Sequence, residues 1–162
     1  KIVINNKIIQ QINTFKYLGC SLSYETEKDL PIKLSKFMQM TGIINRTFKP
    51  STTLQQTRLK LYNTLAIPTL LYGCETWTLK QQDKSRIQAA EMRFLRRTAK
   101  YTWQDYKRNE DIHAELKTEP ILRKIDNYRS NWIQHVRRMD RNRIPKSILQ
   151  HKPQEKENKD VL

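Results

Sequence analysis

Glycine, cysteine and long apolar runs are all scarce in this chain of 162 residues. With only three glycines, tight turns between strands should be few, so we expect helices to dominate. Cys20 and Cys74 are isolated, which excludes the paired spacing of a zinc site and favours two reduced, buried thiols in an intracellular protein. No segment approaches the ~18–20 apolar residues that span a bilayer, so a membrane is not an expected partner.

Residues at catalytic spacings are missing as well. No two aspartates are adjacent, whereas two-metal polymerases and nucleases need clustered carboxylates. His113, His135 and His151 lack the spacing of zinc ligands, and the glycines form neither a P-loop nor a dinucleotide-binding motif. No serine or cysteine lies in a nucleophile motif. We therefore expect no catalytic residue, no metal site and no cofactor within this chain.

Acidic residues are few relative to basic ones. The chain has 31 Lys and Arg against 16 Asp and Glu, a formal net charge of +15. Residues 86–146 carry 16 basic against 8 acidic residues, a local charge of +8. Such an excess repels itself unless a polyanion neutralises it, and nucleic acid is the usual polyanion. Residues 147–162 are neutral and lack apolar periodicity, so we expect a disordered tail there.

The first 29 residues read as short strands and a linker. Apolar residues flank Asn5-Asn6, which is a plausible hairpin turn. Alternation in Phe15–Gly19 predicts a third strand with Phe15 and Tyr17 on one face, either packed on a core or touching a nucleic-acid backbone. Residues 20–29 are polar and are interpreted as a linker.

Two amphipathic helices should follow. Asp29 can cap the first, and Ser51–Thr53 offers a capping box for the second, which Pro68 should break or kink. Trp77 is expected to anchor the core with its indole N–H on a backbone carbonyl, and base stacking is the alternative. Apolar spacing defines the buried stripe of the first helix: Leu30, Leu34, Phe37, Met40, Ile44 and Phe48, with Lys33 outside it. We expect the buried side of the second helix to consist of Leu54, Leu61, Tyr62 and Leu65.

A third helix, from Gln81 or Asp83 to Lys100, carries cations on one face. The spacing of seven, four and three residues aligns Arg86, Arg93, Arg97 and Lys100, and Arg96 borders them. We expect these side chains to contact phosphates. Glu119-Pro120 starts a last helix, whose apolar stripe is Ile121, Leu122, Ile125, Tyr128, Trp132, Val136 and Met139. Its further candidate nucleic-acid ligands are Arg129, Arg137 and Arg138. The expected fold is therefore mainly α, a helical bundle with a small β hairpin or sheet at the N-terminus.

Four sequence blocks stand in order: FKYLG at 15–19, LLYGCETW at 70–77, EMRFLRR at 91–97 and WIQHVRRM at 132–139. Together they resemble the C-terminal part of the endonuclease–reverse transcriptases encoded by animal non-LTR (LINE-like) retrotransposons. The resemblance covers roughly residues 1–150. Each block alone is short, but four in this order form a specific signal.

The resemblance implies a division of the chain and a parent enzyme. Residues 1–20 would be terminal strands of the palm, 24–100 a helical thumb, 101–146 a basic helical connector and 147–162 the tail. Residues similar to the primer-gripping element are Phe15, Lys16, Tyr17, Leu18 and Gly19. The family is an RNA-directed DNA polymerase, but its catalytic aspartates and fingers belong upstream of Lys1, and a chain without an initiating Met is expected to be a fragment.

The same resemblance implies the partners and location. The polymerase uses Mg²⁺, whereas this fragment alone is expected to be inactive and without cofactor. Its expected partners are an RNA–DNA hybrid, template RNA, target DNA and the missing fingers and palm of the parent polyprotein. Its expected location is intracellular, in the nucleus with the ribonucleoprotein of the element.

Two alternatives belong to other classes. One is a standalone, domesticated helical DNA- or RNA-binding module, for which Gln81, Gln82 and Arg86 near the start of the third helix are suitable base-reading residues. The other is a degenerate remnant whose product is unstable.

Overall fold

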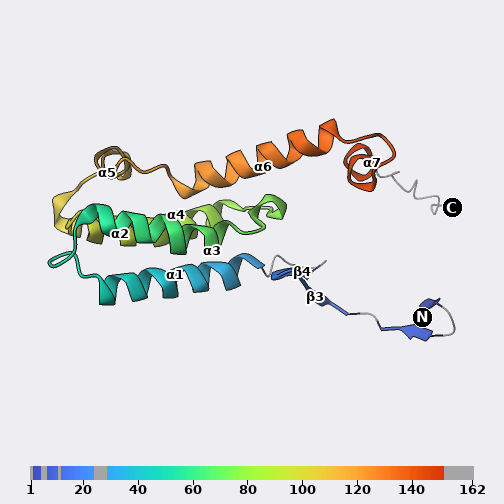
Figure 1. Cartoon of the computed structure of the whole chain (residues 1–162), viewed down its shortest axis with the longest axis horizontal. Coiled ribbons are helices and arrows are strands. Elements are labelled where there is room, and N and C mark those ends of the chain that lie inside the picture. The colour runs from blue at the N-terminus through green and yellow to red at the C-terminus, as the bar shows by residue number, and fades with distance from the viewer. Residues whose placement is uncertain (1, 5–6, 11, 24–28, 152–162) are drawn as a thin grey trace, which may run out of the picture.

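The computed structural model describes residues 2–4, 7–10, 12–23 and 29–151, and within them the chain is mainly helical. Short antiparallel strands lie at the N-terminal end, and the helices form long stacked rows beside them (Figure 1). The fold class predicted from the sequence is therefore confirmed.

The strands form two hairpins. Strand β1 (Ile2–Ile4) pairs with β2 (Lys7–Ile9), and β3 (Thr14–Tyr17) pairs with β4 (Cys20–Ser23). The predicted turn at Asn5-Asn6 lies outside the described residues. Leu18 and Gly19 join β3 to β4 with φ of 47° and 81°, the positive values that a two-residue type I′ turn requires. The interpretation of residues 20–23 as linker was wrong, because they complete this hairpin.

Helix α1 (Asp29–Thr47) follows the predicted stripe with two exceptions. Leu30, Leu34, Phe37 and Ile44 are buried, as their spacing predicts. Phe48 is exposed because α1 ends before it. Lys33, which was expected outside the stripe, is only 4% exposed.

The threonines after α1 do not form the predicted capping box. Helix α2 (Gln55–Leu61) begins after Leu54, and no side chain caps it. The N–H groups of Thr52 and Thr53 and the Thr52 hydroxyl all donate to the Lys49 carbonyl. These residues therefore close the turn between α1 and α2, which leaves Leu54 exposed instead of buried.

Pro68 does not break the second helix. Helix α2 continues through a π-helical segment, η1 (Tyr62–Ala66), into α3 (Ile67–Leu71). The Ile67 N–H donates to the Tyr62 carbonyl five residues back, which accommodates a proline that lacks an N–H and crowds the preceding turn. The wider turn moves the buried side onto Ala66 and Ile67, so Leu65 is exposed and its predicted burial was wrong.

The second half of the chain adds η2 (Cys74–Thr76), α4 (Gln81–Thr98), η3 (Trp103–Asp105), α5 (Asn109–Leu116), α6 (Ile121–Arg138) and α7 (Ile144–Gln150). Residues 147–150 belong to α7, so the predicted disorder was wrong for them, and 152–162 lie outside the described residues. In α6, Ile121, Ile125 and Val136 are buried, but Tyr128 and Trp132 are about half exposed because they line a groove described below.

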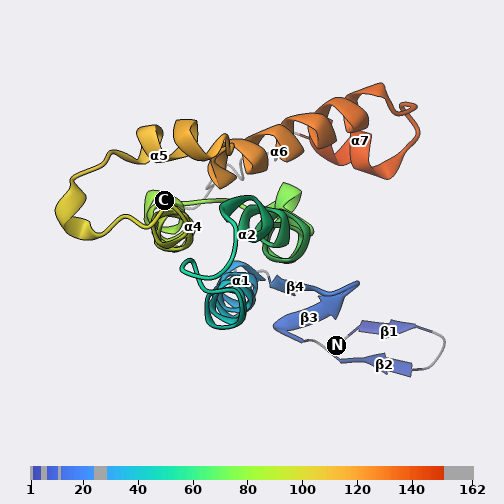
Figure 2. The same cartoon turned by 60° about the vertical axis from the view of Figure 1, so that its left-hand side comes forward.

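The core is centred on three aromatic side chains from three helical segments. Tyr62 of η1 stacks on Phe94 of α4 at 4.7 Å between ring centroids, and Phe37 of α1 meets Tyr62 edge-on at 6.0 Å. All three rings are at most 1% exposed. Figure 2 shows α1, α2 and α4 nearly end-on around this centre, with α5 and α6 on one side of them.

Candidate nucleic-acid interface

Helix α4 is apolar on one side and cationic on the other. Ile87, Phe94 and Leu95 are at most 1% exposed, because they face the core. The opposite side bears Arg86, Arg93 and Arg97. Helix α4 ends at Thr98, so its predicted end at Lys100 was wrong, and Lys100 lies just beyond the helix with φ of +64°. We define these four exposed residues as the α4 cationic face. Within the described part of the chain, none of these four side chains forms an ion pair or a hydrogen bond. Their charge is thus available to a ligand.

Arg96 differs from its neighbours on α4. Its Nη2 donates to the Lys107 carbonyl at 2.9 Å and to Asn109 Oδ1 at 2.7 Å. These bonds tie α4 to the segment that precedes α5. Arg96 therefore has a structural role and is half-buried, unlike the four residues of the cationic face.

Arg97 and Lys100 of the α4 cationic face line a hollow together with Lys49, a residue that the sequence pattern did not indicate. Lys49 lies at the end of α1, outside any periodic stripe. The fold brings it to a hollow of about 470 Å³ that also lies against Arg97 and Lys100. We call this the α4-end hollow; its lining consists of Lys49, Pro50, Ser51, Arg97, Lys100 and Tyr101.

A buried guanidinium lies beneath the α4-end hollow. Arg58 of α2 is fully buried and donates to the Phe48 carbonyl, to Asn45 Oδ1 at 2.5 Å and to Thr98 Oγ1 at 3.1 Å. Every one of these acceptors is neutral. Burial lowers the pKa of Arg58, and the nearby positive charge of Arg97 lowers this pKa further.

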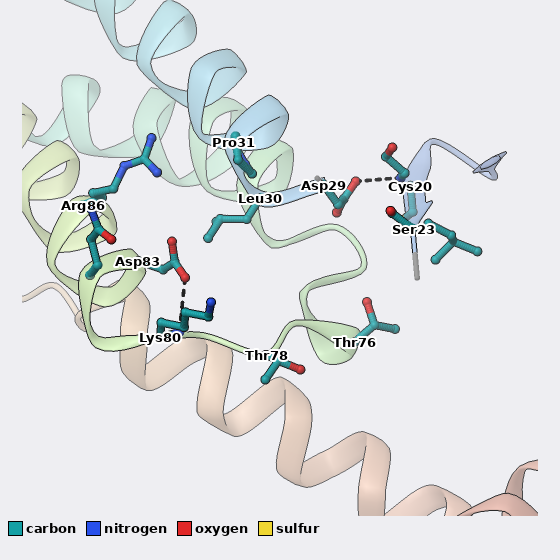
Figure 3. A pocket seen from close by; sticks show the side chains of 13 residues that line it. Cys20, Ser23, Asp29, Leu30, Pro31, Thr76, Thr78, Lys80, Asp83 and Arg86 are labelled. Carbon is teal, nitrogen blue, oxygen red and sulfur yellow. Dashed lines mark hydrogen bonds between the residues drawn. The ribbon is translucent and has the colours of Figure 1, made fainter. Parts of the chain in front are cut away.

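At its other end, α4 borders a second hollow, of about 590 Å³. Arg86 lines it together with Lys80 and Asp83, and the opposite walls are β4 and the first turn of α1 (Figure 3). Asp83 accepts a hydrogen bond from the Lys80 N–H at 3.2 Å, which fixes the start of α4. Lys80 is therefore a second cation near the interface that sequence periodicity did not indicate.

The candidate residues of α6 form a separate set. Arg129 is half-buried, and its charge acts on the thiol of Cys74. Arg137 and Arg138 are exposed. Arg129 and Arg137 line one shallow hollow of about 350 Å³ on α6, which Asp126 also lines, so their charge is partly offset.

The residues that resemble a primer grip form the tip of the second hairpin. Phe15 and Tyr17 stack with ring centroids 6.2 Å apart, so the predicted shared face is confirmed. Both rings are half exposed, and Lys16 is exposed beside them. The interpretation that they pack on a core was wrong, because β3 contributes no buried side chain. Leu18 and Gly19 occupy the turn.

This hairpin is anchored to the helices by a buried carboxylate. Asp29 accepts hydrogen bonds from the Ser21 N–H at 2.9 Å and from Trp77 Nε1 at 3.0 Å, and it pairs with Lys33 at 2.6 Å. We call these four residues the Asp29 hub. Burial opposes ionisation of Asp29, but the bonds from Lys33, Ser21 and Trp77 outweigh it and lower the pKa of this carboxyl. Trp77 is a core anchor as predicted, although its partner is a carboxylate, and 1% exposure excludes base stacking.

The second sequence block approaches the hairpin closely. The Tyr72 hydroxyl donates to the Leu18 carbonyl at 2.9 Å, and Lys33 donates to the Tyr72 carbonyl. Gly73 has φ of +71°, and a Cβ there would lie 2.6 Å from Cys20 Sγ. Only glycine fits this position. Cys20 and Cys74 are both free thiols, and burial raises the pKa of Cys74 to about 12.

Residues from three of the four sequence blocks line one apolar groove of about 740 Å³. Tyr17 and Leu18 come from the first block, Tyr72 from the second and Trp132 from the fourth, with Tyr128 beside it. The third block, residues 91–97, does not line this groove and instead contacts the first residue of α6. Glu91, which is 1% exposed, accepts the Ile121 N–H at 3.1 Å, and burial raises its pKa to about 7.

Among the described residues, no group of three or more His, Cys, Asp or Glu side chains is placed to hold a metal ion. None of the described helices has the length and apolar composition needed to cross a membrane. Comparison with protein-family models, curated proteins and solved structures found no match to this chain.

Proposed function

We propose that this chain grips the phosphate backbone of a nucleic acid with the α4 cationic face, as the thumb and connector of a non-LTR retrotransposon reverse transcriptase. The α4 cationic face carries the proposal. Its four cations are exposed and lack ion-pair partners in the described chain; three of them stand on a helix whose opposite side is buried, and Lys100 follows the end of that helix. A helix packed on the core thus presents cations that form no ion pair within the described chain.

The spacing of the cations suits a helical polyanion. Arg86 and Arg97 are eleven residues apart on α4, which is about 16 Å at ~1.5 Å per residue. This length matches roughly five base steps along a duplex at ~3.4 Å per step. Contacts to phosphates carry no sequence information, so the grip should be sequence-independent and should weaken with salt.

Residues of the sequence blocks also support the proposal, because they hold the helices and the second hairpin together. Gly73 lets the hairpin dock, Trp77 bonds to Asp29, and Glu91 holds the start of α6. On this proposal Gly73, Trp77 and Glu91 keep the thumb rigid, while the exposed cations bind the phosphate backbone. Polymerization and Mg²⁺ belong to the parent enzyme, which would act in the nucleus on template RNA and target DNA.

The test is binding of a short RNA–DNA hybrid as a function of salt, measured by fluorescence anisotropy. The double variant Arg86→Glu with Arg93→Glu should reduce the slope of log affinity against log salt by about 2, because each lost phosphate contact removes ~0.9. The control, Lys36→Glu with Arg46→Glu on exposed positions of α1, changes the net charge equally. Equal losses in both double variants, or a flat salt dependence of the wild type, would refute the proposal.

The start of α4 also has features of a sequence-reading helix. Gln81 and Gln82 are exposed beside Arg86, as base contacts require. A standalone DNA-binding module is therefore the second candidate. Selection from random DNA distinguishes the two, because a sequence reader enriches one motif, whereas a backbone grip enriches none.

A further inference from the structure

The α4-end hollow has a lining without acidic residues. Lys49, Arg97 and Lys100 contribute three positive charges and Ser51 contributes a hydroxyl group, whereas the Tyr101 hydroxyl already donates to Glu115 at 2.7 Å. None of the three cationic side chains has an ion-pair partner in the described chain. A concave surface of this composition has the chemistry of an anion site, since it offers both charge and hydrogen-bond donors.

The buried cation beneath the hollow lacks a counterion. Lys33 and Arg58 are the buried Lys and Arg side chains of the described chain, and they differ in whether they have a counterion. Lys33 is paired with Asp29 at 2.6 Å. Arg58 is equally buried, but its acceptors are Asn45, Thr98 and a backbone carbonyl. A buried charge without a counterion is costly, and an anion nearby offsets that cost.

The contacts of Arg58 place its charge next to the hollow. It donates to the carbonyl of Phe48, which precedes Lys49, and to the hydroxyl of Thr98, which follows Arg97. Both walls of the hollow are therefore fixed to the same guanidinium, and the positive charge of Arg97 acts on Arg58 directly. Arg58 both positions the two walls and adds to the positive potential between them.

We propose that the α4-end hollow binds one phosphate group, with Lys49, Arg97 and Lys100 as its charged ligands and Arg58 as the residue that positions them. The inference rests on the proposed function in that the phosphate belongs to a nucleic acid. It adds that one phosphate is held in a discrete pocket at the end of α4, whereas Arg86 and Arg93 contact the backbone along an open face. An internal phosphodiester and a terminal 5′-phosphate share this chemistry.

The test variant is Lys49→Gln with Lys100→Asn. Lys100 has φ of +64°, a conformation that asparagine tolerates, so the backbone is preserved. The matched control is Lys36→Gln with Lys117→Asn, because both lysines are exposed, Lys117 also has positive φ at 51°, and neither lines the hollow. Equal thermal melts for the two double variants establish that both fold.

Affinity for an RNA–DNA hybrid, with and without a 5′-phosphate, is measured by anisotropy. The pocket variant should lose affinity about tenfold more than the control, because it removes two charge-assisted hydrogen-bond donors to the phosphate. Loss confined to the 5′-phosphorylated hybrid assigns the pocket to a chain end, and equal loss on both hybrids assigns it to an internal phosphodiester. Equal affinity of pocket and control variants would overturn the inference while leaving the proposed function intact.

A second measurement separates the pocket from the grip. Methyl phosphate is titrated into the isotopically labelled full chain, and amide shifts are followed by NMR. Saturable shifts at Ser51, Lys100 and Tyr101 that vanish in the pocket variant support the phosphate site even if the hybrid does not bind. Shifts that are absent, or unchanged in the pocket variant, would overturn it.

Discussion

The Asp29 hub makes the sharpest prediction about stability. Asn at position 29 keeps the size of the side chain but removes its charge, so the ammonium group of Lys33 stays buried without a counterion. Breaking a buried ion pair on one side costs about 3–5 kcal/mol. The hydrogen bond from Trp77 Nε1 to the former carboxylate also weakens. We therefore expect Asp29→Asn to lower the free energy of unfolding by about 4 kcal/mol, a large part of the ~5–15 kcal/mol typical of a domain.

The melting temperature should fall accordingly. An unfolding entropy of about 2.1 cal/mol/K for each of 162 residues gives about 0.34 kcal/mol/K, so 4 kcal/mol corresponds to about 12 °C. Circular dichroism melts and urea titrations measure the effect. The control is Asp126→Asn, because Asp126 is exposed and forms no ion pair in the described chain. A shift in Asp29→Asn no larger than in the control would refute the assigned role of the hub.

Two further measurements address the mechanism of that loss. Adding Lys33→Met to Asp29→Asn should recover much of the stability, because replacing both members of a buried pair by uncharged groups is often nearly neutral. The lowered pKa of Asp29 means that its contribution is present above the unfolded pKa of about 4 and is lost as pH falls through the folded pKa. The stability difference between the wild type and Asp29→Asn should therefore begin to shrink as pH falls below about 4 and should vanish only below the lowered pKa of folded Asp29. If neither expectation is met, loss of the Asp29–Lys33 ion pair is not the cause of the lower stability of Asp29→Asn.

The other predictions concern a buried acid and two glycines. The pKa of Glu91 is raised from 4.5 to about 7, so its stabilising contribution is full below pH 4.5 and is lost as pH rises through 7. At about 1.4 kcal/mol per pH unit this loss is about 3 kcal/mol, and Glu91→Gln should remove that slope from a series of urea titrations. Gly73→Ala should cost about 1–3 kcal/mol, because its Cβ would lie 2.6 Å from Cys20 Sγ at a positive φ. Gly42→Ala is its control: its Cβ meets nothing within 4 Å in α1, so the melting temperature should stay the same or rise, and equal effects at both glycines would contradict the close approach.

Periodicity in the sequence was sufficient for the helices and for the α4 cationic face. Leu30, Leu34 and Phe37 recur at helical steps and are buried, and Arg93 and Arg97 share the opposite exposed side of α4. These features are local, because a helix places residues three and four apart on one side wherever it packs. The spacing predicted the burial of these three α1 residues and the exposure of the two α4 arginines, but it failed for Phe48, for Lys33 and for the end of α4.

Turn chemistry and the π segment were not predictable in the same way. Thr52 and Thr53 have the composition of a helix cap, but they bond back to Lys49 because α1 ends close to the start of α2. Tyr62 is buried while Leu65 is exposed, since the π turn before Pro68 shifts the buried side by one residue. Both outcomes depend on how two helices meet and not on the residues of either one.

The amino-acid sequence by itself determined a helical chain with excess positive charge, and which cations of α4 lie on one exposed side, because composition and helical spacing are properties of the chain alone. Only the tertiary structure decided which charges are buried and what they contact. Lys33 was expected outside the apolar stripe and no sequence pattern indicated Arg58, yet both are buried: Lys33 pairs with Asp29, and Arg58 lies without a counterion beneath the α4-end hollow. Burial and pairing follow from contacts between distant residues, such as Arg58 and Thr98 at 40 positions apart and Asp29 and Trp77 at 48, and no local pattern records them.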